Sequence, residues 1–137
     1  MYLLDTNVVS ETRRERPHRA VASWLRSIGA HEQYVASVTV GELQAGIEIT
    51  RKQDPERAAE LESWLVEDVR ATYRILDMNS EVFRAWARIM DGQSDTLMLD
   101  AMIAATARVN GLTVVTRNVR DFVQLGVPYL NPFEPPG

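Results

Sequence analysis

The chain has 137 residues, no cysteine and two histidines, a composition that predicts one domain with its own core and excludes disulfides and thiolate zinc sites. A bound metal is therefore expected among oxygen ligands, which magnesium and manganese prefer. The formal charge of −4 and the pI of about 5.2 argue against a protein that holds nucleic acid by a broad basic surface, but not against an enzyme that handles it locally.

The first seven residues, MYLLDTN, join a short apolar run to a carboxylate and two small polar side chains. Residues 2–4 suit a strand that is buried on both faces, and Asp5, Thr6 and Asn7 cannot continue that burial unsatisfied. The open edge of a parallel sheet is where ligands bind. The sequence therefore predicts a site at the end of the first strand, with Asp5 as one wall.

The next segments alternate between helical and strand patterns. Residues 10–19 are polar and contain Pro17, which predicts a helical turn and a loop. An amphipathic helix is expected from Ala20 to Gly29, followed by a strand over residues 34–37. Thr39 and Glu42 form a capping-box pattern at the start of a further helix. Another helix is expected from residue 54, a third strand over residues 74–76 and a helix from residue 80.

The most strongly patterned helix opens at Thr96, has Leu99, Met102 and Ile103 on its inward side, and stops at Gly111. Residues 112–116 predict a fourth strand, residues 117–124 a loop and short turn, and residues 127–130 an edge strand. Residues 131–137 are expected to fray. Strands and helices alternate, so the predicted class is α/β, with a mainly parallel sheet of four to five strands flanked by helices. We expect a single domain over residues 1–137 in a soluble cytoplasmic protein without a membrane segment.

The acidic residues of these segments are expected at one edge of the sheet. In a parallel layout each helix begins at the carboxyl edge, because helices run antiparallel to the strands. Asp5 ends the first strand, Glu42 and Asp100 fall near the starts of their helices, and Asp121 follows the fourth strand by five residues. Converging carboxylates repel one another unless a cation neutralises them. Magnesium bound among them would activate water for phosphodiester hydrolysis.

Four segments carry a resemblance to a known family: LLDTN, SVTVGELQAGI, LDAMIAATA and VVTRNVRDF, in this order and spacing. Together they resemble the PIN-domain ribonucleases of the VapC toxin type, and the closing GVPYLNPF is similar to the FitB-like branch. The resemblance implies a PIN-like three-layer sandwich. It also implies a Mg²⁺- or Mn²⁺-dependent endoribonuclease that cleaves structured RNA such as tRNA. Its expected assembly is a homodimer held inactive by a VapB-type antitoxin, with DNA contacted only through that antitoxin.

Carried over by residue, the resemblance makes Asp5, Glu42, Asp100 and Asp121 the catalytic and metal-binding quartet, with Asp5 and Asp100 as the first candidates for direct ligands. Asn118 stands where some relatives place the fourth acid, so that charge is assigned to Asp121. Asp95 is a second-line candidate. The supporting residues are Thr6, Asn7, Thr116 and Asn118, and the candidate RNA-binding residues are Arg13, Arg14, Arg117 and Arg120.

Each of these residues also has an ordinary structural interpretation. Asp5 could end a strand in a turn, Glu42 could serve only as a cap, and Asp121 could pair with a nearby arginine. An arginine cluster around residues 13–19 could be a solvated face. Trp24, Trp64 and Trp86 are interpreted as core or interface, and the first two mark a possible dimer surface.

Two kinds of protein compete with the nuclease interpretation. Haloacid-dehalogenase-like phosphatases and receiver domains also gather acids around magnesium, but both need a lysine near a strand end. The only lysine, Lys52, lies between two expected helices. The alternative from another class is a catalytically inactive PIN-fold module that binds an antitoxin or RNA.

Overall fold

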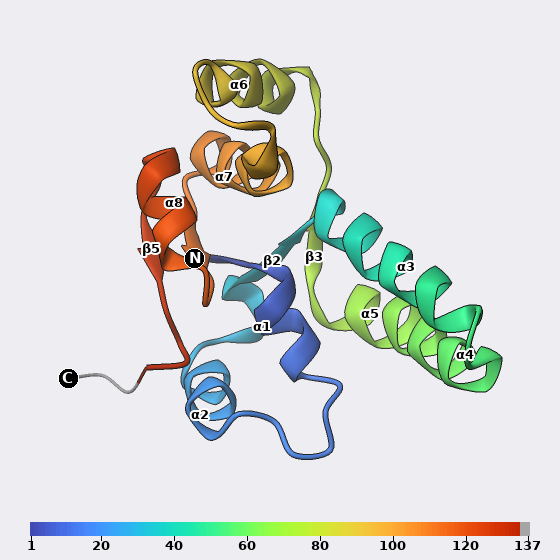
Figure 1. Ribbon diagram of the computed structural model, residues 1–137. Helices are drawn as coiled ribbons and strands as arrows, with labels where there is room; N and C mark the ends of the chain where they lie inside the picture. Colours follow the sequence, from blue (N-terminus) through green and yellow to red (C-terminus); the bar gives the residue numbers. More distant parts are fainter. Residues whose placement is uncertain (135–137) are drawn as a thin grey trace.

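The computed structural model describes residues 1–134, so residues 135–137 of the expected frayed tail lie outside the described part. Five parallel strands form one sheet in the order β3-β2-β1-β4-β5, with β1 at its centre (Figure 1). The α/β class and the parallel sheet are confirmed. The strands are β1 (Tyr2–Leu4), β2 (Gln33–Ala36), β3 (Arg74–Leu76), β4 (Thr113–Val115) and β5 (Tyr129–Leu130).

Helices connect these strands and cover both faces of the sheet. None of those described is long and apolar enough to cross a membrane. The π-helical η2 continues α4 directly into α5. The helical segments are α1 (Thr6–Glu11), α2 (Arg19–Ser27), η1 (Ala30–Glu32), α3 (Ser37–Arg51), α4 (Pro55–Ser63), η2 (Trp64–Val69), α5 (Arg70–Thr72), α6 (Ser80–Met90), η3 (Asp95–Leu97), α7 (Met98–Asn110) and α8 (Val119–Leu125).

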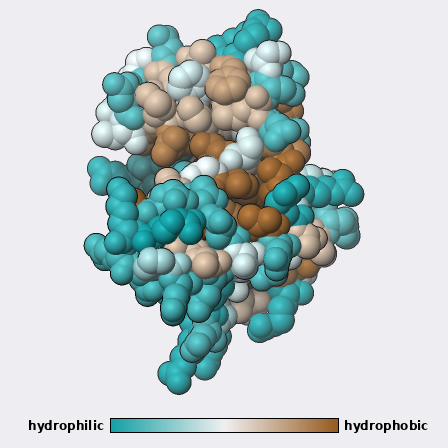
Figure 2. All heavy atoms as spheres, turned by 90° about the vertical axis from the view of Figure 1, so that its right-hand side faces the viewer, coloured by the Kyte–Doolittle hydropathy of each residue, from teal (hydrophilic) through white to brown (hydrophobic). Residues whose placement is uncertain are grey.

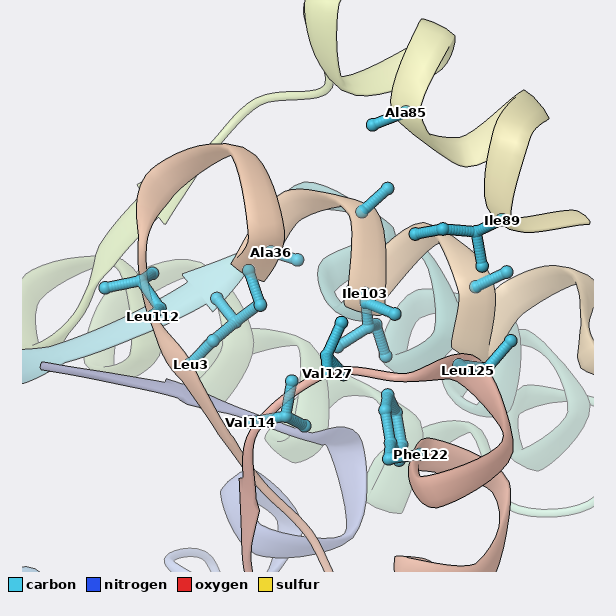
Figure 3. Packing of buried hydrophobic residues seen from close by; sticks show 14 of the residues in the cluster. Leu3, Ala36, Ala85, Ile89, Ile103, Leu112, Val114, Phe122, Leu125 and Val127 are labelled. Carbon is cyan, nitrogen blue, oxygen red and sulfur yellow. The ribbon is translucent and has the colours of Figure 1, made fainter.

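Alternating strand residues divide the core into two clusters, because successive side chains of a strand point to opposite faces. On one face, Leu3 packs with Ile103 of α7 and Phe122 of α8 (Figure 3). On the other, Leu4 packs in a cluster with Val8 of α1 and with side chains of α2 to η2. Both clusters are buried, which gives the three-layer sandwich expected from the resemblance.

Local structure differs from expectation at two helices. A full helix, α1, begins immediately after Asp5, which caps it by accepting a hydrogen bond from Thr6 N, and residues 119–125 form the helix α8 rather than a short turn. Leu99 was expected to face inward but is 45% exposed, because it lies in the first turn of α7, at the rim of the sheet.

The tail also departs from the expected fraying. Phe133 is buried, and its ring makes an edge contact with His18 at 5.1 Å between centroids. The two tryptophans that the sequence suggested for a dimer surface also make contacts within the chain. The Trp24 ring packs edge-on against Tyr2 at 5.0 Å between centroids, and Trp64 is partly buried against the second cluster. The chain is therefore packed through Phe133, and both tryptophans pack against the core while staying partly exposed.

A candidate acidic site at the carboxyl edge of the sheet

The strand order creates a crevice beside the first strand. From β1 the sheet extends through β2 and β3 on one side and through β4 and β5 on the other, and ligands bind at such a switch point in open α/β sheets. Asp5 follows β1 and Thr116 follows β4. The Thr116 hydroxyl donates to Asp5 Oδ2 at 2.7 Å across this crevice.

Asp5 is the most buried acid of the site, with 4% of its surface exposed. Its oxygens accept hydrogen bonds from Thr6 N at 2.7 Å and from Asn7 Nδ2 at 3.2 Å, in addition to the Thr116 hydroxyl. Burial raises the pKa of Asp5, and these three donors oppose that rise because they favour the charged carboxylate. Asp5 therefore caps α1 and also presents a carboxylate to the crevice.

Glu42 reaches the site from α3, although not as a cap. This helix begins at Ser37, directly after β2, so Thr39 and Glu42 lie inside it and the predicted capping box is wrong. The Thr6 hydroxyl donates to Glu42 Oε1 at 3.1 Å, and burial raises the pKa of Glu42. The purely structural interpretation of Glu42 as a cap is thereby removed.

Asp100 and Asp121 are brought together by one amide. Asn118 Nδ2 donates to Asp100 Oδ2 at 3.0 Å and to Asp121 Oδ2 at 2.6 Å. The Asn118 backbone N–H in turn donates to the Thr116 hydroxyl at 2.9 Å, which links this pair to Asp5. Within residues 1–134, Asp121 forms no ion pair with a nearby arginine, contrary to the ordinary interpretation given above.

The electrostatics of the four acids show that they share one region. The pKa of Asp100 is raised to about 7, first by burial and then by the negative charge of Asp5, with further contributions from Asp121 and Glu42. An acid with three acidic neighbours favours its protonated form unless a cation is present. The other three sequence-predicted acids thus all act on the Asp100 carboxylate.

The donor set fits a hard divalent cation in its chemistry, since it consists of carboxylate, amide and hydroxyl oxygens. In the part of the chain that the structure describes, no three acidic or histidine side chains are grouped so that they could ligate one ion together. Magnesium commonly uses one or two carboxylates and keeps several waters. The residues present fit such a cation, which part of the quartet would hold directly and the rest would hold through water.

The candidate RNA-binding arginines lie in different settings around this edge. Arg14 pairs with buried Glu11 at 3.3 Å, and Arg120 is exposed on α8. Arg13 lines a groove of about 280 Å³ between α1, α3 and α4 that also includes Glu42 and Trp64. Burial and the neighbouring arginines lower the pKa of Arg13. Arg13 and Arg14 thus lie close together just after α1, whereas Arg120 belongs to α8.

Two observations concern residues that the sequence placed differently. Asp95 is exposed in η3, and no hydrogen bond of residues 1–134 joins it to the acidic network. Phe133 had no assigned role, yet its ring lies under the guanidinium of Arg117, with Cζ 4.3 Å from the ring centroid. The sequence signal for this contact is weak, because sixteen positions separate the two residues and only the fold brings them together.

The fold and this edge define a class: a parallel α/β protein that gathers carboxylates beside its central strand. A family model described as "PIN domain" matches residues 2–127. The chain therefore belongs to the PIN domain family, as the resemblance implied.

Named relatives align over nearly the whole chain. The Plasmid stability protein StbB of Pseudomonas syringae is 35% identical, covering 98% of this chain and 99% of its own. Toxin FitB of Neisseria gonorrhoeae is 32% identical, and the alignment covers 97% of this chain and 99% of FitB. VapC ribonuclease Y4jK of Sinorhizobium fredii is also 32% identical, with 98% of this chain and 99% of the relative covered. These names confirm the resemblance to VapC-type and FitB-like proteins.

Solved structures of FitB-containing complexes have a similar fold. The crystal structure of FitAcB from Neisseria gonorrhoeae contains a chain with a TM-score of 0.85 and 32% identity, covering 97% of this chain and 99% of its own. The structure of FitAB bound to an IR36 DNA fragment gives a TM-score of 0.87 and 29% identity, with 100% and 99% covered. The similarity thus extends over the whole fold.

Proposed function

We propose that this chain is a metal-dependent endoribonuclease, the toxin of a type II toxin-antitoxin system, which hydrolyses phosphodiester bonds of structured RNA such as tRNA in the cytoplasm. The observation that carries the proposal is a hydrogen-bond network that gathers the four acids at one edge of the sheet. It joins Asp5 to Thr116, Asp100 and Asp121 to Asn118, and Glu42 to Thr6, whose backbone N–H bonds to Asp5. The ribonuclease name of a relative aligned along the whole chain supports the proposal.

The proposed cofactor is Mg²⁺ or Mn²⁺. Asp5 and Asp100 are the first candidates for direct ligands, with Glu42 and Asp121 completing the site directly or through water. When bound, such an ion supplies a water of lowered pKa and offsets negative charge on the phosphate.

The protein's own contribution is to hold the carboxylates in place before the ion and the RNA arrive. Thr116 and Asn7 orient Asp5, Thr6 orients Glu42, and the Asn118 amide fixes the remaining pair. In the metal-free protein the Asp100 carboxyl binds its proton more tightly than an ordinary aspartate does, because burial and the neighbouring acids raise its pKa to about 7. Loading the site requires Asp100 to release that proton.

The deciding experiment is incubation of the purified full chain with total RNA, with and without Mg²⁺, followed by mapping of new RNA ends. We expect discrete new ends with Mg²⁺, none with EDTA, and none with Asp5→Asn. Equal cleavage by wild type and Asp5→Asn in Mg²⁺ would remove the acidic-site mechanism. Binding of RNA or a partner without any new ends would favour the inactive PIN-fold module.

We also propose that the partner is a VapB-type antitoxin, through which the complex contacts DNA. The similarity to a chain of FitAB bound to DNA supports this assignment. Four unneutralised carboxylates beside an open groove would attract a cationic side chain, so the antitoxin is proposed to place an arginine among them. An antitoxin affinity that ignores Asp100→Asn would contradict this placement.

A homodimer is the proposed assembly, and exposed apolar side chains on α6 and α7 support it. Phe83, Met98 and Leu99 are 46%, 38% and 45% exposed. Trp86 links them, because its ring packs edge-on against Phe83 and its Nε1 donates to Met98 O at 3.2 Å. Figure 2 shows a band of apolar atoms across one face of the molecule, at the height of α7 and the start of α3. We define Phe83, Met98 and Leu99 as the apolar patch.

A further inference from the structure

An arginine stands beside the acidic site without joining it. Arg117 lies between Thr116, which bonds to Asp5, and Asn118, which bonds to the other two aspartates. Its backbone N–H donates to Asn7 Oδ1 at 3.1 Å, so the main chain is fixed at the rim of the site. Nevertheless, within residues 1–134 the Arg117 guanidinium pairs with no carboxylate, and the side chain is exposed.

An aromatic ring accounts for this arrangement. The guanidinium carbon of Arg117 lies 4.3 Å from the centroid of the Phe133 ring, within the range of a cation–π contact. A guanidinium stacked on a ring face keeps the N–H groups at its edge available for planar hydrogen bonding to an anion. A guanidinium lying among the acids would instead donate its N–H groups to their carboxylates.

The ring itself is fixed from two sides. Phe133 N donates to Asn131 Oδ1 at 2.9 Å, and the Phe133 ring packs edge-on against His18. His18 is held by its backbone N–H, which donates to the buried Glu11 carboxylate at 2.7 Å. The ring is therefore a fixed support that the closing segment of the chain delivers to the Arg117 side chain.

We propose that Phe133 is a positioning residue for Arg117, whose main chain is fixed at the rim of the acidic site. The Phe133 ring holds the Arg117 guanidinium with its edge open to a backbone phosphate of the bound RNA. This inference rests on the proposed nuclease function and adds to it a phosphate subsite. Arg117 contacts a phosphate neighbouring the one that is cut, and Phe133 acts only through Arg117. The closing segment is thereby part of substrate binding.

The test is a double-mutant cycle with Arg117→Met and Phe133→Leu on the full chain. Two quantities are measured: binding of a short fluorescein-labelled RNA in EDTA as a function of salt, and KM and kcat for cleavage in Mg²⁺. We expect Arg117→Met to weaken RNA binding and raise KM about fivefold, with kcat nearly unchanged. The slope of log Kd against log salt should become shallower by about 0.7 to 1.

Phe133→Leu should reproduce part of this loss in wild type and cause none in the Arg117→Met background. Phe133→Tyr keeps an aromatic ring, so this variant should bind RNA as wild type does. Arg74→Met removes an exposed arginine at the start of β3, on the opposite edge of the sheet, and is the matched control. If Leu at position 133 prevents folding, as judged by the thermal transition, Phe133→Met replaces it in the cycle.

Equal effects of Phe133→Leu in both backgrounds would show that Phe133 acts on the fold alone and would overturn the inference. So would an unchanged Kd and salt slope for Arg117→Met. If the wild type cuts RNA and either of these results is found, only the proposed phosphate subsite is contradicted. A wild type that binds RNA without cutting it, or does neither, contradicts the nuclease proposal instead.

Discussion

The Thr116 hydroxyl donates to Asp5 Oδ2 at 2.7 Å and thereby joins two residues that lie 111 positions apart in the chain. Both follow buried strands that are neighbours in the sheet, β1 and β4. Because the bond is formed within the fold itself, it orients the Asp5 carboxylate without help from an ion. The fold consequently bears the repulsion among the acids whenever the ion is absent.

Replacing Asp5 should separate activity from stability. Burial raises the pKa of the Asp5 carboxyl, so its negative charge is unfavourable in the fold. Asp5→Asn removes that charge, and the amide oxygen can still cap α1. We expect cleavage to fall about 100-fold or more and the Tm in EDTA to stay equal or rise. Differential scanning fluorimetry and the RNA assay measure the two effects. Asp68→Asn, an exposed acid on η2, is the control and should change neither.

The metal-free protein should lose stability as pH rises from about 4 to about 7. The folded-state pKa of Asp100 is about 7, against 3.8 for an ordinary aspartate, so between these pH values the folded chain binds more protons than the unfolded chain. The free energy of unfolding therefore decreases with pH over this window and levels off above it. Asp100 is half-buried, so solvent screening reduces the size of the effect.

Tm measured in EDTA across this window, for wild type and Asp100→Asn, checks that prediction. We expect the variant to show a flatter profile, because the group responsible is gone. A wild-type Tm that increases steadily from pH 5 to pH 7, as ordinary paired carboxylates would cause, would contradict the assigned sign. Added Mg²⁺ should raise the wild-type Tm most at the alkaline end, where Asp100 has already lost its proton.

The sequence predicted the elements and their edge better than the contacts inside the site. The apolar runs at Leu3 and Val114 identify buried strands because a strand covered on both faces needs apolar residues throughout. Glu42 was placed at the correct edge for a wrong reason, since the helix starts earlier than its capping pattern indicates. The Asn118 bridge and the Phe133 support could not be predicted, because each depends on distances between segments far apart in the chain.

Dimerisation should depend on the apolar patch. Phe83→Ser exposes a polar group where a second copy would pack, so we expect the dimer to dissociate at least about tenfold more readily. Size-exclusion chromatography with light scattering over a dilution series measures this shift. Ile49→Ser alters a 66% exposed side chain on α3 outside the patch and should leave the dimer intact. A wild type that is monomeric at every concentration, or equal behaviour of the two variants, would refute the assignment.

Converting the amide bridge into a carboxylate should make the protein more dependent on metal. Asn118 donates to both Asp100 and Asp121, and Asn118→Asp replaces this donor with a further negative charge between them. We expect the Tm in EDTA to fall by a few degrees and the rise on adding Mg²⁺ to exceed that of wild type.

Two comparisons separate the added charge from the lost bridge. Asn118→Ala removes the bridge without adding charge, so its Tm in EDTA should fall while its response to Mg²⁺ stays near that of wild type. Asn79→Asp adds the same charge at the start of α6, where Asn79 Oδ1 caps Val82 N at 2.9 Å and aspartate caps equally well. Its Mg²⁺ response should match wild type. If Asn118→Asp and Asn118→Ala gain the same stability from Mg²⁺, the carboxylates around Asn118 do not form the cation site.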